Sequence, residues 1–287
     1  MNKVSKIYDG TDPGATPGRV FTASIGQETI VQEGKFLDYL MFGLKGAVST
    51  AAVAIEDFAG VLSEYTLRVG ADTRILLNLR QMVALMAFYY GELPFIWENT
   101  DNTGNDFIGG VKLPLNLAVD ANKPINHAAT KTAVANVGTE TLGISGYFSD
   151  AGNGKKPIHA VAISKTTAAA TGYDLADVTL PPIGKLKGVI LQHANTFADG
   201  NIDISVQRLR LLVNGQISSQ FNSLTDSEGI PGIFNGVEDP ITDMLKVFSF
   251  FRLPGDGIDL KANEVKFQLD VEDASDAVAI IPVIEIE

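Results

Sequence analysis

The sequence of 287 residues has no cysteine, and its 22 basic residues are outnumbered by 34 acidic ones. Because cysteine is absent, the chain can form no disulfide, no thiolate metal site and no cysteine nucleophile. The formal charge of −12 repels a polyanion, which argues against direct, sequence-specific binding of nucleic acid. A hydrophobic content of 45% is ordinary for a globular protein, and the length suits two domains that each bury a core.

Long apolar runs are also missing from the chain. The longest candidates, Gly46–Ile55 and Ala277–Ile284, are too short to span a bilayer. The first residues include two lysines but no apolar segment, so we expect no signal peptide there. Glycine and proline recur between residues 10 and 17. We therefore predict that residues 1–18 form an irregular N-terminal arm.

The three histidines, His127, His159 and His193, are widely spaced along the chain. A bicupin enzyme holds a transition metal with a His-x-His pair, a glutamate and a distant histidine, and no such pair occurs here. The segment Gly143–Gly146 lacks the spacing of a serine nucleophile elbow, and Gly152–Lys156 is too short for a phosphate-binding loop. We therefore predict no catalytic and no cofactor-binding residue, and expect each histidine at the surface or in a hydrogen bond.

Alternation of apolar and polar residues, the pattern of a half-buried strand, recurs along the chain. It is clearest at Val111–Val119 and Val265–Val271. From Ile202 the alternation slips by one residue, which predicts a bulge or strand break near Gln207. Four runs are apolar on both sides and are expected to be covered by the core or by a neighbouring subunit: Phe36–Leu44, Val189–Leu191, Val247–Phe251 and Val278–Ile284. Pro282 in the last run predicts an edge or a bulge, because proline cannot donate to the ladder.

The most clearly helical segment is Arg80–Tyr90, which is apolar nearly all round and is stopped by Gly91 and Pro94. Such a helix must be buried, and we expect it to cap the end of a sheet. A weaker helical pattern covers Val48–Phe58.

The chain also repeats itself at about half its length. Glu64–Leu79 and Val206–Leu224 each place a strand-like run before a tight turn, at Gly70-Ala71 and Asn214-Gly215, and a second apolar run after it. The offset of roughly 145 residues exceeds any solenoid or propeller repeat and indicates two similar domains in tandem. Many short strands separated by turn residues indicate all-β sandwiches or barrels. We predict a first domain at residues 19–166 and a second at residues 167–287.

This pattern resembles the double jelly-roll major capsid proteins of tailless icosahedral viruses, particularly small bacteriophages with an internal membrane. The segments that carry the resemblance are Phe36–Val48, Leu67–Leu79, Gly109–Val119, Leu180–His193, Arg208–Gln216, Leu245–Phe251, Ile258–Val271 and Ala277–Glu287. A loop with Asp226, Gly229 and Gly236 belongs to the same pattern. The resemblance implies an all-β fold of two tandem eight-stranded jelly rolls, with one or two short helices.

The resemblance also implies a viral structural protein without enzymatic activity. It predicts self-assembly as a homotrimer whose six similar barrels form a pseudo-hexagonal tile of an icosahedral capsid. The expected location is the virion, after assembly in the host cytoplasm. The expected partners are further copies of the chain in the trimer and in neighbouring capsomers, minor capsid or vertex proteins, and an internal membrane or its proteins through the N-terminal arm.

Two further patterns leave alternatives open. Asp199, Asn201 and Asp203 open like a calcium loop, but the required glycine and glutamate do not follow, so a turn into a strand is favoured over a structural Ca²⁺ site. Oxygen-rich loops at Asp101–Asp106, Asp256–Asp259 and Glu272–Asp276 could also bind Ca²⁺.

The second pattern is an aromatic cluster at Trp97, Tyr89, Tyr90 and Phe95. It suits a core or trimer contact, but also a sugar-stacking platform. The alternative function is therefore a tandem jelly-roll carbohydrate- or receptor-binding protein.

Overall fold

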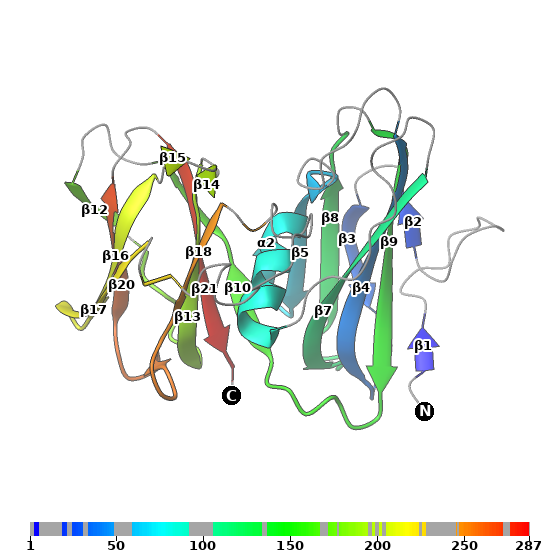
Figure 1. The fold of residues 1–287 in the computed structure, drawn as a ribbon. Coiled ribbons are helices and arrows are strands. Elements are labelled where there is room, and N and C mark those ends of the chain that lie inside the picture. The colour runs from blue at the N-terminus through cyan, green and yellow to red at the C-terminus, as the bar shows by residue number, and fades with distance from the viewer. Residues whose placement is uncertain are drawn as a thin grey trace. The chain divides into compact units, whose positions relative to one another are not determined.

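The computed structural model divides the chain into two compact units, Met1–Pro157 and Ile158–Glu287. The residues it describes are 3–5, 19–21, 25–30, 34–48, 59–91, 106–133, 137–166, 172–176, 178–194, 197–198, 201–202, 205–223, 226–227, 245, 247–271 and 276–286. Each unit is built mainly from antiparallel strands (Figure 1).

The first unit contains nine described strands and one helical segment. They are β1 (Lys3–Ser5), β2 (Arg19–Phe21), β3 (Ile25–Ile30), β4 (Phe36–Val48), β5 (Leu62–Val69), β6 (Asp72–Leu77), α2 (Leu79–Leu85) continued by the π-helical turn η1 (Met86–Tyr90), β7 (Asp106–Ala118), β8 (Ile125–Lys131) and β9 (Val137–Ser149). One sheet has the order β2-β9-β4-β7, with β1 also paired to β9. The facing sheet has the order β3-β8-β5-β6.

The strands of the second unit follow the same plan. They are β10 (Ile158–Val161), β11 (Ile163–Thr166), β12 (Gly172–Ala176), β13 (Lys185–Gln192), β14 (Phe197–Ala198), β15 (Asn201–Ile202), β16 (Val206–Val213), β17 (Gln216–Asn222), β18 (Phe248–Arg252), β19 (Ile258–Asp259), β20 (Val265–Val271) and β21 (Ala277–Glu285). Strands β10 and β11 pair with β21, which pairs with β13, which pairs with β18 and β19. The facing sheet has the order β12-β20-β16-β17, and β14 and β15 form a small separate hairpin.

The two units therefore have identical strand orders. For this comparison β1 with β2, β10 with β11 and β18 with β19 each count as one interrupted strand, and the separate β14–β15 hairpin is left out. When the eight remaining strands of each unit are numbered along the chain, both units have one sheet in the order 1-8-3-6 and one in the order 2-7-4-5. Two such four-stranded antiparallel sheets make a jelly roll. The predicted double jelly roll is thereby confirmed.

The internal repeat is the hairpin of the fourth and fifth strands in each unit. Leu67 of β5 and Leu211 of β16 lie 144 residues apart, and the pairing shifts register directly after each of them. Each hairpin then closes through a two-residue turn, between Val69 and Asp72 and between Val213 and Gln216. A shared bulge at the same distance from a shared turn is the structural counterpart of the repeat in the sequence.

Helix α2 follows β6 and confirms the helix predicted at residues 80–90. Asn78 caps its start: the Asn78 side chain accepts from the Gln81 backbone N–H, and the Gln81 side chain accepts from the Asn78 N–H. The helical segment ends at Gly91, whose φ of 64° is accessible to glycine at little cost. Residues 79 and 81–88 are buried, as an all-round apolar helix requires.

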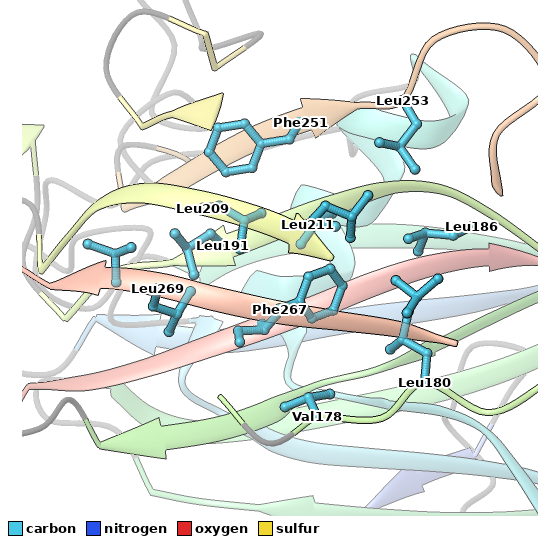
Figure 2. Packing of buried hydrophobic residues seen from close by; sticks show 14 of the residues in the cluster. Val178, Leu180, Leu186, Leu191, Leu209, Leu211, Phe251, Leu253, Phe267 and Leu269 are labelled. Carbon is cyan, nitrogen blue, oxygen red and sulfur yellow. The ribbon is translucent and has the colours of Figure 1, made fainter. Parts of the chain in front are cut away.

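The core of the second unit fills the space between its two sheets. Figure 2 shows side chains from facing strands, among them Leu191, Leu209 and Phe267, gathered in this space. On strand β20 every second residue is buried, as the alternation at residues 265–271 predicted. The predicted slip near residue 207 is also present, as a register shift between Val206 and Arg208.

The four runs that are apolar on both sides lie on strands β4, β13, β18 and β21. In the second unit, Ile190, Phe250, Ile281 and Val283 are apolar residues of these strands that lie outside the sandwich core. That a neighbouring subunit covers the outer face of these strands stays a prediction.

Pro282 interrupts a central strand rather than an edge or a bulge, which corrects the prediction. Strand β21 pairs with β13 on one side, where Pro282 lies opposite Val189. On the other side the ladder stops between Ala160 of β10 and Ile163 of β11, opposite Pro282. The proline therefore lies at the gap between two partner strands, where its missing N–H breaks no ladder bond.

The boundary between the units also differs from the predicted one. The units divide at Pro157, nine residues before the predicted boundary at 166. The reason is that β10 and β11 pair with β21 and so form the first strand of the second jelly roll. In the predicted irregular arm, Lys3–Ser5 forms a strand that pairs with β9.

Candidate assembly surface

The first unit has a half-buried sheet face that a bulge in β4 creates. Both pairings of β4 shift register between Leu37 and Tyr39. Against β9, Asp38 is the extra residue, because Phe148 and Tyr147 opposite Leu37 and Tyr39 are consecutive. Against β7 the extra residue lies on β7, between Pro114 and Leu117. Asp38 is only 4% exposed, and its carboxylate accepts a hydrogen bond from Ser149 Oγ at 3.0 Å. After the bulge Leu40 and Phe42 point into the core. Tyr39 therefore lies on the opposite face of the sheet.

Tyr39 forms a small cluster with residues of the two neighbouring strands. Its ring stacks on that of Tyr147 from β9, with centroids 4.2 Å apart and an interplanar angle of 17°. The ammonium of Lys112 from β7 lies 4.6 Å from the centroid of Tyr39. Met41 lies directly opposite Lys112 in the ladder. We call Tyr39, Met41, Lys112 and Tyr147 the tyrosine–lysine patch.

The Tyr39 hydroxyl of the patch is partly shielded from water. Partial burial, together with Tyr147 and Asp38, raises the pKa of the Tyr39 hydroxyl above its ordinary value. Each of the four patch residues is half-buried. Among the described residues, Lys112 contacts no carboxylate, and its ion–ring contact is with Tyr39.

The segment that follows β9 is held against the same sheet. Asn153 Nδ2 donates to the Asp38 carbonyl at 2.8 Å, and the Asn153 N–H donates to Asn116 Oδ1 at 3.2 Å. Asn116 has a φ of 70° and donates to the Lys155 carbonyl. The ammonium of Lys155 lies 4.5 Å from the ring centroid of Tyr90, whose hydroxyl donates to the Pro114 carbonyl at 3.0 Å. Hydrogen bonds thus order the segment at Gly152–Lys156 that follows β9.

Formal charge differs between the two units. Met1–Pro157 contains 13 basic and 16 acidic residues, a formal charge of −3, whereas Ile158–Glu287 contains 9 and 18, a charge of −9. Asp226, Asp259 and Glu264 are among the exposed acidic residues of the second unit. The first unit therefore repels an acidic partner less than the second does.

A serine–histidine pair lies in the second unit, but inside its core. His193 Nε2 is 2.8 Å from Ser249 Oγ, which donates to the Ser223 carbonyl at 3.2 Å. His193 is 2% exposed and Ser249 0%. Burial lowers the pKa of His193 to about 4, so the imidazole is neutral at pH 7. A substrate cannot reach this pair, and its chemistry is that of a satisfied core hydrogen bond.

The other histidines differ in their burial. His127 lies in the core of the first unit, 4.0 Å from Glu28 and close to the Tyr65 ring. His159 is half-buried on β10. The sequence predicted each histidine either at the surface or in a hydrogen bond. His127 and His193 are not at the surface, and His193 makes the predicted hydrogen bond.

The calcium candidates remain predictions. Asp199 and Asp203 lie outside the described residues, and Asn201 begins β15 with its side chain outside them. In the candidate loop at Asp256–Asp259, Asp256 pairs with Lys185 and Lys187, which hold its pKa at about 2. Within the part of the chain that is described, no three acidic or histidine side chains are placed to share a metal ion.

Several other sequence candidates lie outside the described ranges. These are Trp97, Phe95, residues 49–58 of the weaker helix, residues 101–105 and residues 272–275. Of the aromatic cluster, Tyr89 and Tyr90 are described and meet edge to face, with centroids 4.8 Å apart. None of the helices that the structure describes has the length and apolar character needed to cross a membrane.

Sequence reasoning missed the tyrosine–lysine patch. Strict alternation from Leu37 would point Tyr39 into the core, and only the bulge at Asp38 reverses this. The available signal was the single acidic residue in an otherwise apolar run.

Comparison with known proteins finds likeness in structure alone. No protein-family model and no curated protein sequence matches the chain. The major capsid protein of Sulfolobus turreted icosahedral virus is similar with a TM-score of 0.67 and 11% identity, over 93% of this chain and 95% of that one. A second structure, of the whole virus, has a TM-score of 0.60 and 12% identity, over 94% and 91%.

A third similar structure is the major capsid protein P2 of bacteriophage PM2. Its TM-score is 0.55 at 8% identity, over 94% of this chain and 98% of that one. Both jelly rolls of this chain are therefore included in the likeness, and the chain has the double jelly-roll fold of these capsid proteins.

Proposed function

We propose that this chain is the major capsid protein of a tailless icosahedral virus and that it self-assembles as a pseudo-hexagonal homotrimer. The observation that carries the proposal is the identical strand order of the two units, in a fold shared over nearly the whole chain with viral major capsid proteins. A threefold ring of a duplicated domain presents six similar barrels, so one polypeptide supplies the near-sixfold outline that a shell tile needs.

The role proposed is structural rather than enzymatic, and the location is the virion after assembly in the host cytoplasm. The burial of the His193–Ser249 pair supports this, because that pair cannot meet a substrate. Further copies in neighbouring capsomers and minor capsid or vertex proteins are the proposed partners. Structural Ca²⁺ in the shell is a separate proposal, which removal of metal tests.

The N-terminal arm is proposed to contact an internal membrane, its proteins or a neighbouring capsomer. Lys3 and Lys6 support contact with anionic lipid, since basic residues near a terminus are attracted to such surfaces. Deleting residues 1–18 should leave the trimer folded, because the described part of this arm is the three-residue strand β1, which pairs along the edge of β9. Shell assembly, followed by electron microscopy, should fail. A truncated chain that cannot fold would contradict this assignment of the arm.

Light scattering on the purified chain tests the proposed function. The expected result is a stable particle with three times the 30.6 kDa mass of the chain. A monomer that binds glycans on an array would instead favour the carbohydrate- or receptor-binding alternative, which the stacked Tyr39 and Tyr147 rings could serve. Stoichiometric transition metal in an elemental analysis would favour a bicupin enzyme.

A further inference from the structure

We propose that the tyrosine–lysine patch of the first unit binds the acidic second unit of a neighbouring copy of this chain. The inference rests on the proposed function and identifies the surface through which the copies join. Its occupant is a second copy, and its chemistry is aromatic burial combined with a lysine–carboxylate contact.

The composition of the patch suits a protein interface. Tyrosine is enriched where partners meet, because its ring buries a large area and its hydroxyl can still donate a hydrogen bond. Tyr39 and Tyr147 are already stacked, so little side-chain freedom is lost when a partner covers them. The ammonium of Lys112 lies over the Tyr39 ring without a described carboxylate partner, which leaves donors for an acidic side chain from outside.

Because the two units have the same strand order, the face that holds the patch can be compared with the corresponding face of the second unit. Strands β4, β7 and β9 correspond to β13, β18 and β21. In the second unit the face opposite the core is apolar and contains Ile190, Phe250 and Ile281, which lie side by side in the ladder. In the first unit the same kind of face holds the half-buried patch. A half-buried patch of aromatic and apolar side chains on the outer face of a sheet indicates a contact surface for another molecule.

Charge complementarity indicates which surface binds the tyrosine–lysine patch. The second unit has a formal charge of −9 against −3 for the first. If two patches met each other in a twofold dimer, the contact would contain two Lys112 ammonium groups and no carboxylate from either patch. In a closed ring of three the contact joins two different surfaces. The patch then meets the acidic unit of the next copy, which satisfies Lys112 and closes the ring.

Charge reversal tests the patch. Lys112→Glu should raise the dissociation constant of the trimer at least about tenfold, since a like charge replaces an attractive one at the contact. Lys123→Glu is the matched control, because Lys123 is exposed in a turn outside the patch. The double variant Tyr39→Ser, Tyr147→Ser should weaken the trimer further. Sedimentation measures the assembly, and circular dichroism of each variant at the same concentration verifies the fold.

Crosslinking identifies the partner surface directly. A benzoyl-phenylalanine in place of Tyr39 is irradiated in a mixture of ¹⁵N-labelled and unlabelled chains. Mass spectrometry should find crosslinks between differently labelled chains that end in residues 158–287. Crosslinks that end in residues 1–157 of the other chain would overturn the proposed partner unit.

The outcomes separate this inference from the proposed function. If the unaltered chain is a monomer, the proposed function fails and the patch loses its role with it. If the unaltered chain is a trimer and Lys112→Glu dissociates no more than Lys123→Glu, the patch assignment is overturned while the proposed function stands.

Discussion

In the second jelly roll, the outer face of strands β13, β18 and β21 is apolar, with Ile190, Phe250 and Ile281, whereas in the first the corresponding strands β4, β7 and β9 carry the tyrosine–lysine patch. The strand orders and the bulged hairpins are nevertheless the same in both. The two copies thus retained the pairing pattern that defines the barrel and diverged on their surfaces. A ring built from unlike surfaces requires such divergence, because each contact joins two different patches.

The largest effects should come from breaking either core. Phe42 in the first unit and Phe267 in the second are both fully buried. Replacing either by alanine should lower the free energy of unfolding by about 3–5 kcal/mol, because a cavity remains in a close-packed interior. Urea denaturation measures the loss.

Hydrogen exchange then tells whether the two cores are separate. Phe42→Ala should speed exchange mainly in residues 1–157, and Phe267→Ala mainly in residues 158–287. Ile217→Ala is the control, since Ile217 is 55% exposed. Equal acceleration of both units by either variant would contradict the division into two cores.

Acid should destabilise the second unit through His193. Its pKa is about 4 in the folded chain against an ordinary value of 6.5. Between these pH values the unfolded chain binds a proton that the folded chain does not, so stability is complete above pH 6.5 and falls as the pH drops toward 4. The expected loss is about 3 kcal/mol.

A histidine variant isolates this contribution from those of the carboxylates. His193→Asn removes the titrating group, so its free energy of unfolding should fall less between pH 7 and pH 4 than that of the unaltered chain. Urea titrations of both proteins at the two pH values measure the difference. The same pH slope in both would show that His193 is not responsible.

The two hairpin turns offer a smaller test. Gly70 has a φ of 61°, and Asn214, 144 residues later, has a φ of 52°. Because a Cβ at Gly70 would meet nothing within 4 Å, only backbone strain opposes a side chain there. Gly70→Val should lower the free energy of unfolding by about 1–2 kcal/mol, whereas Gly70→Asn, which copies the second turn, should cost much less. Equal losses, measured by thermal unfolding, would mean that the turns are not equivalent.

Much of the fold follows from local patterns in the sequence. The hairpins, the helix after β6 and the bulge near residue 207 each depend on turn residues or on a phase change within a few positions. Such features are set by nearby residues, so a single sequence can reveal them.

Features that depend on distant pairing could not be predicted in the same way. Whether residues 158–166 belong to the first or second barrel is decided by their pairing with β21, more than 100 residues away. The outward turn of Tyr39 depends on the bulge at Asp38, and Ser149 of strand β9 donates a hydrogen bond to the Asp38 carboxylate. Neither partner is marked in the local sequence.

The smallest effect is expected from metal removal. The calcium-like residues Asp199, Asn201 and Asp203 lack the glycine and glutamate of a complete loop. Adding EDTA should therefore leave the melting temperature of both units unchanged. A drop that excess Ca²⁺ restores would show that the chain binds a structural ion.

Electron microscopy of the purified particles tests the central claim most directly. A ring of three duplicated jelly rolls should give class averages with threefold symmetry and six similar barrel densities around the axis. Particles with two barrels, or rings in which the six densities do not fall into two alternating kinds, would contradict the proposed tile.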